Sequence, residues 1–215
     1  MHAAVPSTVV GAARARAAPL VSPAARQRAD APHDARVDRT CVELLHIEMA
    51  ATLAASAAYQ TRRANDLVAQ LHVDDAHARI PPALSSADEA EMANARMEAV
   101  GAHVGGALME RLAPDRARST QTLERVKFVC KELWTALWDK QVDNLRTNHR
   151  GVFVLHDASF RPLRTAHAAP GLVAEQLAFA TGVVQGALER LGVAASVHAD
   201  ASQAPQCAFH VRVAS

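Results

Sequence analysis

Very few residues in this sequence have the types and spacing that covalent catalysis requires. Cys130 could act as a nucleophile if a histidine from elsewhere in the chain activated it. Its neighbours Phe128, Val129 and Leu133 are apolar, which favours a buried and inert thiol instead. The sequence also lacks the P-loop, GxGxxG, HExxH and GxSxG motifs. We therefore predict no catalytic residue, no cofactor-binding residue and no enzyme activity for the chain itself.

Three polar side chains in the second half of the chain have the donor atoms that a metal ion needs. His149, His156 and Asp157 lie close in sequence, and imidazole and carboxylate groups are common zinc ligands. A polar turn followed by the end of a surface hairpin explains the same residues without a metal. We therefore predict no metal site.

The turn from Asn144 to Gly151 contains Arg146 and Arg150, which are the best local candidates for contact with an acidic partner. Two arginines in a turn are about as well explained by anchoring of the loop, in which each guanidinium pairs with a carboxylate of its own domain. Solvated charge on an ordinary turn is a further explanation. Arg146 and Arg150 are therefore candidates for a secondary contact with a partner, and loop anchoring and solvated charge remain the alternative explanations.

The bulk composition limits the class of protein. A chain of 215 residues with 50% hydrophobic residues is long enough for one core, so one domain plus extensions is expected. The 23 Lys and Arg residues balance 22 Asp and Glu residues, which argues against a nucleic-acid-binding surface over the whole protein. Cys41, Cys130 and Cys207 form no CxxC pair and favour a reducing compartment. No run approaches the roughly 20 consecutive apolar residues that span a bilayer, so we expect a soluble or peripheral protein.

Residues 1–38 are rich in Ala, Arg and Pro and have few large apolar side chains. Such a segment cannot bury enough surface to offset the entropy of ordering its backbone, so we predict a disordered tail. Its arginines and lack of early acidic residues also fit a mitochondrial transit peptide. Four prolines interrupt any amphipathic helix there, which favours the disordered tail.

A first helix is predicted for residues 40–60, because Thr40 and Glu43 fit a capping box and apolar residues then recur at helical spacing. Its second half is rich in alanine, whose small side chain allows another backbone to approach closely. Residues 61–85 are polar and contain Pro81 and Pro82, so we predict a long loop, with one weak helical turn around Leu67–Leu71, inserted into a single domain that spans residues 39–215.

A second helix is predicted from Ser86 or Asp88 to the residues before Pro114. Three glycines interrupt it, namely Gly101, Gly105 and Gly106. Each exposed glycine inside a helix costs about 1 kcal/mol relative to alanine, so close contact with another helix is favoured over a break. The apolar faces of these first two helices fit either an internal core or a partner surface, and the small residues favour the partner surface.

A third helix over residues 119–142 holds both tryptophans of the chain, Trp134 and Trp138, and is predicted to be a packing centre. The remaining predicted elements are a hairpin of strands at 152–155 and 160–163, a helix from Pro170 or Gly171 to Leu191, and strands at 195–201 and 206–213. The order is therefore ααα-ββ-α-ββ. Since alternating βαβ units are absent, we predict an α+β fold with helices on one face of an antiparallel or mixed sheet.

The most specific stretch is KFVCKELWTALWDKQVDNLRTNHRGVFVLHDASFRPL, from Lys127 to Leu163. It closely resembles the signature of the sixth small subunit of TRAPP, the transport protein particle that tethers vesicles and activates Rab GTPases. Other segments resemble further parts of the same family: VELLHIEM its first helix, MEAVGAHVGGALMERL its second, LAFATGVVQGALERLGV its last helix and ASQAPQCAFHVRV its final strand. The likeness covers about residues 40–60 and 86–213.

This resemblance implies an α+β fold in which helices pack on a twisted four-stranded antiparallel sheet and the first two helices form a dimer interface. Carried onto this chain, the interface consists of Leu45, Met49, Leu53, Val100, Val104 and Leu108. The implied partner is the third small TRAPP subunit in a heterodimer, with a homodimer as the alternative for the isolated chain. Other TRAPP subunits would join them, and a Rab GTPase would be contacted only through the assembled complex.

The same resemblance implies a non-catalytic scaffold or adaptor in ER-to-Golgi and Golgi transport. The expected location is cytoplasmic and peripheral to Golgi and ER-derived membranes. The tail of residues 1–38 and the loop at 61–85 have no counterpart in the family. A related subunit carries an acylated cysteine, and none of the three cysteines here matches its position. The alternative function is a lipid-binding or small-molecule-binding module of related fold.

Overall fold

The computed structural model describes residues 37–74, 82–113, 121–148, 150–166 and 172–214. Residues 39–215 form one compact unit. The predicted disorder of the N-terminal tail concerns residues that lie, apart from the last two, outside the described part of the chain. That expectation therefore stays a prediction.

The first described helix is much longer than the sequence pattern indicates. Helix α2 runs without a break from Arg39 to Asp74, so the predicted loop is wrong for residues 61–74. Arg, Ala, Leu and Gln make up half of this stretch, and all four have high helix propensity, which its polar and charged residues concealed. Asn65 fixes the second half of α2, because its amide donates to the carbonyl of Leu84 at 3.0 Å and accepts from the Leu84 N–H at 2.8 Å.

Helix α2 also meets the length and composition of a membrane span, which corrects the expectation that no segment would. The qualifying stretch is Thr40–Leu71, with 32 residues. It contains Glu43, Glu48, Arg62 and others that would each cost about 2.5–3.5 kcal/mol at the centre of a bilayer. Much of its apolar character comes from alanine, so a helix that packs against protein explains the composition as well.

Helices α3 and α7 form the central packing contact of the molecule. Helix α3 spans Ser86–Leu112, and Ser85 caps it by exchanging hydrogen bonds with Asp88 in a capping box. Helix α7 spans Leu172–Arg190. A Cβ on Gly105 would lie 2.1 Å from the carbonyl oxygen of Val183, and one on Gly182 would lie 1.9 Å from that of Glu98. The glycines therefore allow a backbone-to-backbone approach, which confirms the predicted close contact for Gly101 and Gly105 but not for Gly106, whose Cβ would lie 3.8 Å from the nearest atom.

The tryptophan-bearing helix is shorter than predicted and contains a π-helical turn. Its parts are α4 (Thr122–Phe128), the π-helix η1 (Val129–Leu133) and α5 (Trp134–Trp138). It ends at Asp139, which adopts the left-handed conformation at φ 56°. The returning chain uses a carbonyl of the π-helical turn, since the Val142 N–H donates to the carbonyl of Cys130 at 3.0 Å.

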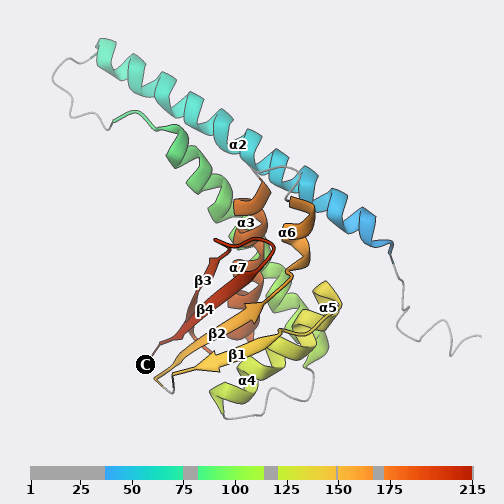
Figure 1. The fold of residues 1–215 in the computed structure, drawn as a ribbon. Coiled ribbons are helices and arrows are strands. Elements are labelled where there is room, and N and C mark those ends of the chain that lie inside the picture. The colour runs from blue at the N-terminus through green and yellow to red at the C-terminus, as the bar shows by residue number, and fades with distance from the viewer. Residues whose placement is uncertain (1–36, 75–81, 114–120, 149, 167–171, 215) are drawn as a thin grey trace, which may run out of the picture. The chain divides into compact units, whose positions relative to one another are not determined.

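Four antiparallel strands form one sheet in the order β1-β2-β4-β3 (Figure 1). They are β1 (Asn144–Thr147), β2 (Val152–Asp157), β3 (Ala195–Asp200) and β4 (Cys207–Val213). The sequence predicted β2, β3 and β4 but treated β1 as a turn. It was also wrong for residues 160–163, because helix α6 begins at Arg161 and continues to Ala166. Pro162 suits the first turn of a helix, where its missing N–H has no intrahelical acceptor.

Helices α3 and α7 and the tryptophan helix lie on one face of this sheet, whereas α2 packs on α3 (Figure 1). An aromatic cluster lies between the tryptophan helix and the sheet. Trp134 and Trp138 have ring centroids 4.3 Å apart, and Trp134 lies 5.3 Å from Phe209 of the sheet. Phe160 lies 5.0 Å from Trp138 and 5.5 Å from Phe209. The predicted α+β architecture and the predicted packing centre are both confirmed.

Candidate partner interface and the polar cluster behind it

A groove of about 290 Å³ opens between the first half of α2 and helices α3, α5, α6 and α7. We call it the α2 groove. Its apolar lining includes Leu45, Met49, Val100, Val104, Leu137 and Phe179. Its position follows from the α3–α7 contact, because the side of α3 next to the glycines carries Val100 and Val104 towards α2.

Four of the six predicted interface residues line the α2 groove, namely Leu45, Met49, Val100 and Val104. Leu53 and Leu108 do not line the groove. Both are half-buried against the core, and the same is true of Met49, Val100 and Val104. Leu45 is 63% exposed and is the most accessible of the six. The structure therefore brings most of the predicted set together on one surface, and one member, Leu45, points largely into solvent.

Sequence reasoning missed how much of α2 is exposed around this set. Val42, Leu44 and Ile47 are large apolar residues with exposed fractions of 45%, 57% and 37%. The segment VELLHIEM carries apolar residues on nearly all sides of the helix, and this could have indicated the exposure. Exposed aliphatic side chains on one helix, next to an apolar groove, are typical of a surface that another protein covers.

Three polar side chains in the groove were also missed. His46 stacks on Phe179 at 4.5 Å, and burial lowers the pKa of its imidazole, so it is neutral at pH 7. Gln176 is only 6% exposed, and its amide makes no hydrogen bond with any residue that the structure describes. The Nη1 atom of Arg161 is buried without a hydrogen-bond acceptor among the described residues and lies 3.6 Å from Asp139. Gln176 could have been noticed as a polar residue on the apolar side of α7.

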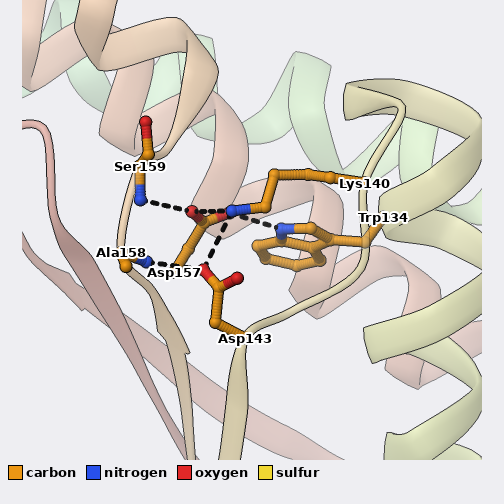
Figure 2. Close-up of polar contacts among 6 residues, drawn as sticks. All are labelled: Trp134, Lys140, Asp143, Asp157, Ala158 and Ser159. Carbon is orange, nitrogen blue, oxygen red and sulfur yellow. Dashed lines mark hydrogen bonds and ion pairs between the residues drawn. The ribbon is translucent and has the colours of Figure 1, made fainter.

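A second group of polar residues lies behind the groove, where the tryptophan helix meets the end of β2 (Figure 2). The carboxylate of Asp157 is 1% exposed and accepts three hydrogen bonds. The donors are Trp134 Nε1 at 2.9 Å, Lys140 Nζ at 2.6 Å and the Ser159 N–H at 2.9 Å. We call this the Asp157 cluster. Protein donors therefore satisfy the carboxylate of Asp157 within the folded chain.

Asp143 completes the Asp157 cluster (Figure 2). It accepts from Lys140 Nζ at 2.9 Å and from the Ala158 N–H at 2.7 Å, and these bonds lower the pKa of its carboxyl group. Partial burial disfavours the charged ammonium of Lys140, but its bonds to Asp157 and Asp143 outweigh this and raise its pKa. Both shifts favour the charged forms of Lys140 and Asp143.

The other predicted residues lie apart from both regions. Arg146 is exposed on β1 and lines a polar hollow of about 370 Å³ with His156 and Asp200, and Arg150 is exposed in the turn after β1. Neither lines the α2 groove. His149 lies outside the described residues, and no group of three or more metal-ligating side chains was found within the described part of the chain.

The three cysteines are free. Burial raises the pKa of the Cys130 thiol to about 12, and burial together with Asp157 and Asp200 raises that of Cys207 to about 12. A thiol with such a pKa holds almost no thiolate at neutral pH, which agrees with the inert Cys130 that the sequence predicted. Cys41 is exposed at the start of α2.

Comparison with known proteins identifies the class of protein. Residues 42–214 match the family described as "Transport protein particle (TRAPP) component", and the chain therefore belongs to this family. Within it, the chain is 40% identical over 135 residues to the mouse (Mus musculus) trafficking protein particle complex subunit 6B, covering 60% of this chain and 85% of that protein.

The human (Homo sapiens) subunit 6A is 42% identical over 119 residues, covering 54% of this chain and 74% of that protein. The chain is thus a small subunit of the subunit-six type, as its signature segment predicted. A solved subunit 3 from Naegleria fowleri, covalently bound to palmitic acid, has a TM-score of 0.42 at 15% identity, over 74% of this chain and 96% of that one. A likeness this low has no bearing on function.

Proposed function

We propose that this chain is a non-catalytic structural subunit of the TRAPP vesicle-tethering complex and that it pairs with the third small TRAPP subunit. Family membership supports the first part. The observation that carries the second is the α2 groove, where Leu45 stays 63% exposed beside a mainly apolar lining. A partner that covered this surface would remove exposed apolar area from water, which is the main driving force for stable association.

In this proposal the chain contributes no covalent chemistry. The complex promotes nucleotide exchange on a Rab GTPase, and this subunit holds neighbouring subunits in position for that contact. It would work in the cytoplasm at Golgi and ER-derived membranes. The relatives are named as subunits of a trafficking complex, which favours this role over a lipid-binding or small-molecule-binding module.

Co-expression with the third small TRAPP subunit of the same organism tests the pairing. Size-exclusion chromatography with light scattering should give a 1:1 complex. Leu45→Asp should weaken that complex at least about tenfold, because it places a charge against apolar partner atoms. Since Leu45 is largely exposed, the isolated variant should keep its thermal stability.

Leu67→Asp is the matched control. Leu67 lies on the same helix, is 52% exposed and does not line the α2 groove. This variant should bind like the wild type. A wild-type chain that formed only a homodimer, or a Leu45→Asp variant that bound as tightly as Leu67→Asp, would rule out the proposed pairing surface.

A further inference from the structure

The α2 groove has two polar groups that the folded chain leaves without hydrogen bonds. Gln176 is 6% exposed, and its amide has two N–H donors and one acceptor but no partner among the described residues. Arg161 has its Nη1 buried without an acceptor in the same part of the chain. Both side chains line the groove. Buried polar groups are nearly always hydrogen-bonded in folded proteins, so the buried Nη1 of Arg161 requires an explanation. The Gln176 amide adds further donors to the same groove without being fully buried itself.

The charges around the groove leave Arg161 only partly compensated. Asp139 lies 3.6 Å from its Nη1, beyond hydrogen-bond range, and the Asp139 side chain is 71% exposed, so water screens the pair. Glu43 lines the groove as well but forms no ion pair with Arg161 in the described structure. His46 adds no positive charge, because burial lowers its pKa. The groove therefore offers two hydrogen-bond donors, one of them cationic, inside an apolar surface.

We propose that the partner subunit inserts a helix whose apolar face carries one carboxylate, and that this carboxylate accepts hydrogen bonds from Gln176 and Arg161. The proposal rests on the pairing proposed above and specifies the chemistry of the partner. A carboxylate has the lone pairs to accept from a guanidinium and an amide together, and it balances the charge of Arg161. A groove between helices is the usual receptor for an amphipathic helix, whose side chains enter at every third or fourth position.

Gln176 acts in this arrangement as a specificity-determining residue. A partner whose helix is wholly apolar would leave both donors buried without acceptors, and such a complex is disfavoured. A partner with a carboxylate at the matching position satisfies them. The same groove thus attracts an apolar helix in general and selects among such helices by one polar contact.

The decisive test is whether Gln176→Leu weakens or strengthens binding to the third small TRAPP subunit. This change keeps the side-chain size and removes the amide. If the partner supplies an acceptor, isothermal titration calorimetry should show binding at least about tenfold weaker, because the acceptor loses its donor. The isolated variant should melt at a temperature no lower than the wild type, because leucine suits a position that is only 6% exposed.

Gln185→Leu is the matched control, since Gln185 lies half-buried on the same helix outside the groove. It should bind as the wild type does. Gln176→Leu binding equal to or tighter than wild type would overturn the inference while leaving the heterodimer intact. No binding by the wild-type chain would overturn the proposed pairing and the inference together.

Arg161→Met supplies an independent measurement. Combined with Glu→Gln or Asp→Asn changes along the partner's docking helix, it gives double-mutant cycles. One partner carboxylate should couple to Arg161. Removal of that carboxylate should weaken binding to the wild-type chain about tenfold but weaken binding to the Arg161→Met variant much less. If every partner carboxylate gave additive effects with Arg161→Met, the carboxylate contact would be excluded.

Discussion

The Asp157 cluster and the α2 groove each contact one member of a pair of neighbouring tryptophans, and they differ in how completely their polar atoms are satisfied. Trp134 donates to Asp157, whereas Trp138, 4.3 Å away, lines the groove. Asp157 accepts three hydrogen bonds at 2.6–2.9 Å. In the groove, the Gln176 amide and Arg161 Nη1 have no hydrogen-bond partner within the described residues.

The hydrogen bonds of the Asp157 cluster therefore form when the chain folds, whereas those of the α2 groove form only when another molecule binds. A buried carboxylate with three donors contributes to the stability of the isolated chain and has no capacity left for a ligand. A groove with exposed leucines and unpaired donors reduces the stability of the isolated chain and gains free energy when another molecule covers it. We therefore expect changes in the cluster to affect folding and changes in the groove to affect binding.

Gly182→Ala should produce the largest effect, because it acts on the α3–α7 contact that supports both regions. The new Cβ would lie 1.9 Å from the carbonyl oxygen of Glu98, so the two helices must separate. We expect a loss of about 3 kcal/mol or more in the free energy of unfolding, measured by urea denaturation. Partner binding should fall as well, since α3 carries Val100 and Val104 into the groove.

Gly106→Ala is its control, with a Cβ 3.8 Å from the carbonyl oxygen of Gly186, an ordinary contact distance. It should be neutral or stabilising by up to about 1 kcal/mol, because alanine favours the helix. Equal destabilisation by both substitutions would mean that helix propensity, and not the close approach, determines the effect.

Asp157→Ala should reduce stability by about 2–3 kcal/mol, because it leaves the buried indole N–H of Trp134 and the ammonium of Lys140 without their shared acceptor. Chemical denaturation monitored by tryptophan fluorescence would measure this loss. At a temperature where the variant is still folded, its affinity for the partner should equal that of the wild type. A folded variant that lost binding would contradict the separation of the two regions.

The parts of the fold that the sequence predicted are those in which local pattern and tertiary packing agree. The start at Ser86 or Asp88 and the apolar periodicity located α3, which the structure caps at Ser85, and Gly192, at φ 75°, follows the end of α7 as expected. Residues 61–74 were mispredicted, because their short apolar pattern at Leu67 and Leu71 packs on no core and stays exposed. What holds this part of the helix includes a contact between Asn65 and Leu84 that no local pattern reveals. Strand β1 was missed for a similar reason, since Asn144 and Arg146 face solvent and pairing with β2 is what makes the segment extended.

The residues of the candidate interface show the same contrast between those that the sequence located and those that only the structure reveals. The family resemblance located Leu45, Met49, Val100 and Val104, which the structure brings together. Arg161 and Gln176 were not predicted, because one lies in a segment expected to be a strand and the other is a single polar residue in an apolar helix. Only the three-dimensional arrangement reveals that both lack hydrogen-bond partners at the same groove.

Asp143→Asn should give a smaller effect that depends on pH. The bonds from Lys140 and from the Ala158 N–H lower the pKa of Asp143 in the folded state, so its stabilisation is present above the unfolded pKa of about 3.8 and is lost as the pH falls through the lower, folded value. The variant should therefore be less stable than the wild type by about 0.5–1 kcal/mol at pH 7, because the pair is partly exposed. Denaturation at several pH values should show this gap narrowing below about pH 4; a constant gap would mean that the charge of Asp143 is not involved.

The smallest expected effect is a change in the alkylation rate of a thiol, which can be measured on the wild-type chain. Cys130 and Cys207 are buried with pKa values near 12, whereas Cys41 is exposed next to Val42, which lines the α2 groove. Alkylation of the native chain at neutral pH, followed by mass spectrometry, should therefore modify Cys41 alone, and unfolding should expose the other two. Because a partner in the groove would cover the start of α2, Cys41 should react more slowly in the complex than in the isolated chain. An unchanged rate would place the partner farther along α2, away from Val42 and towards Leu53.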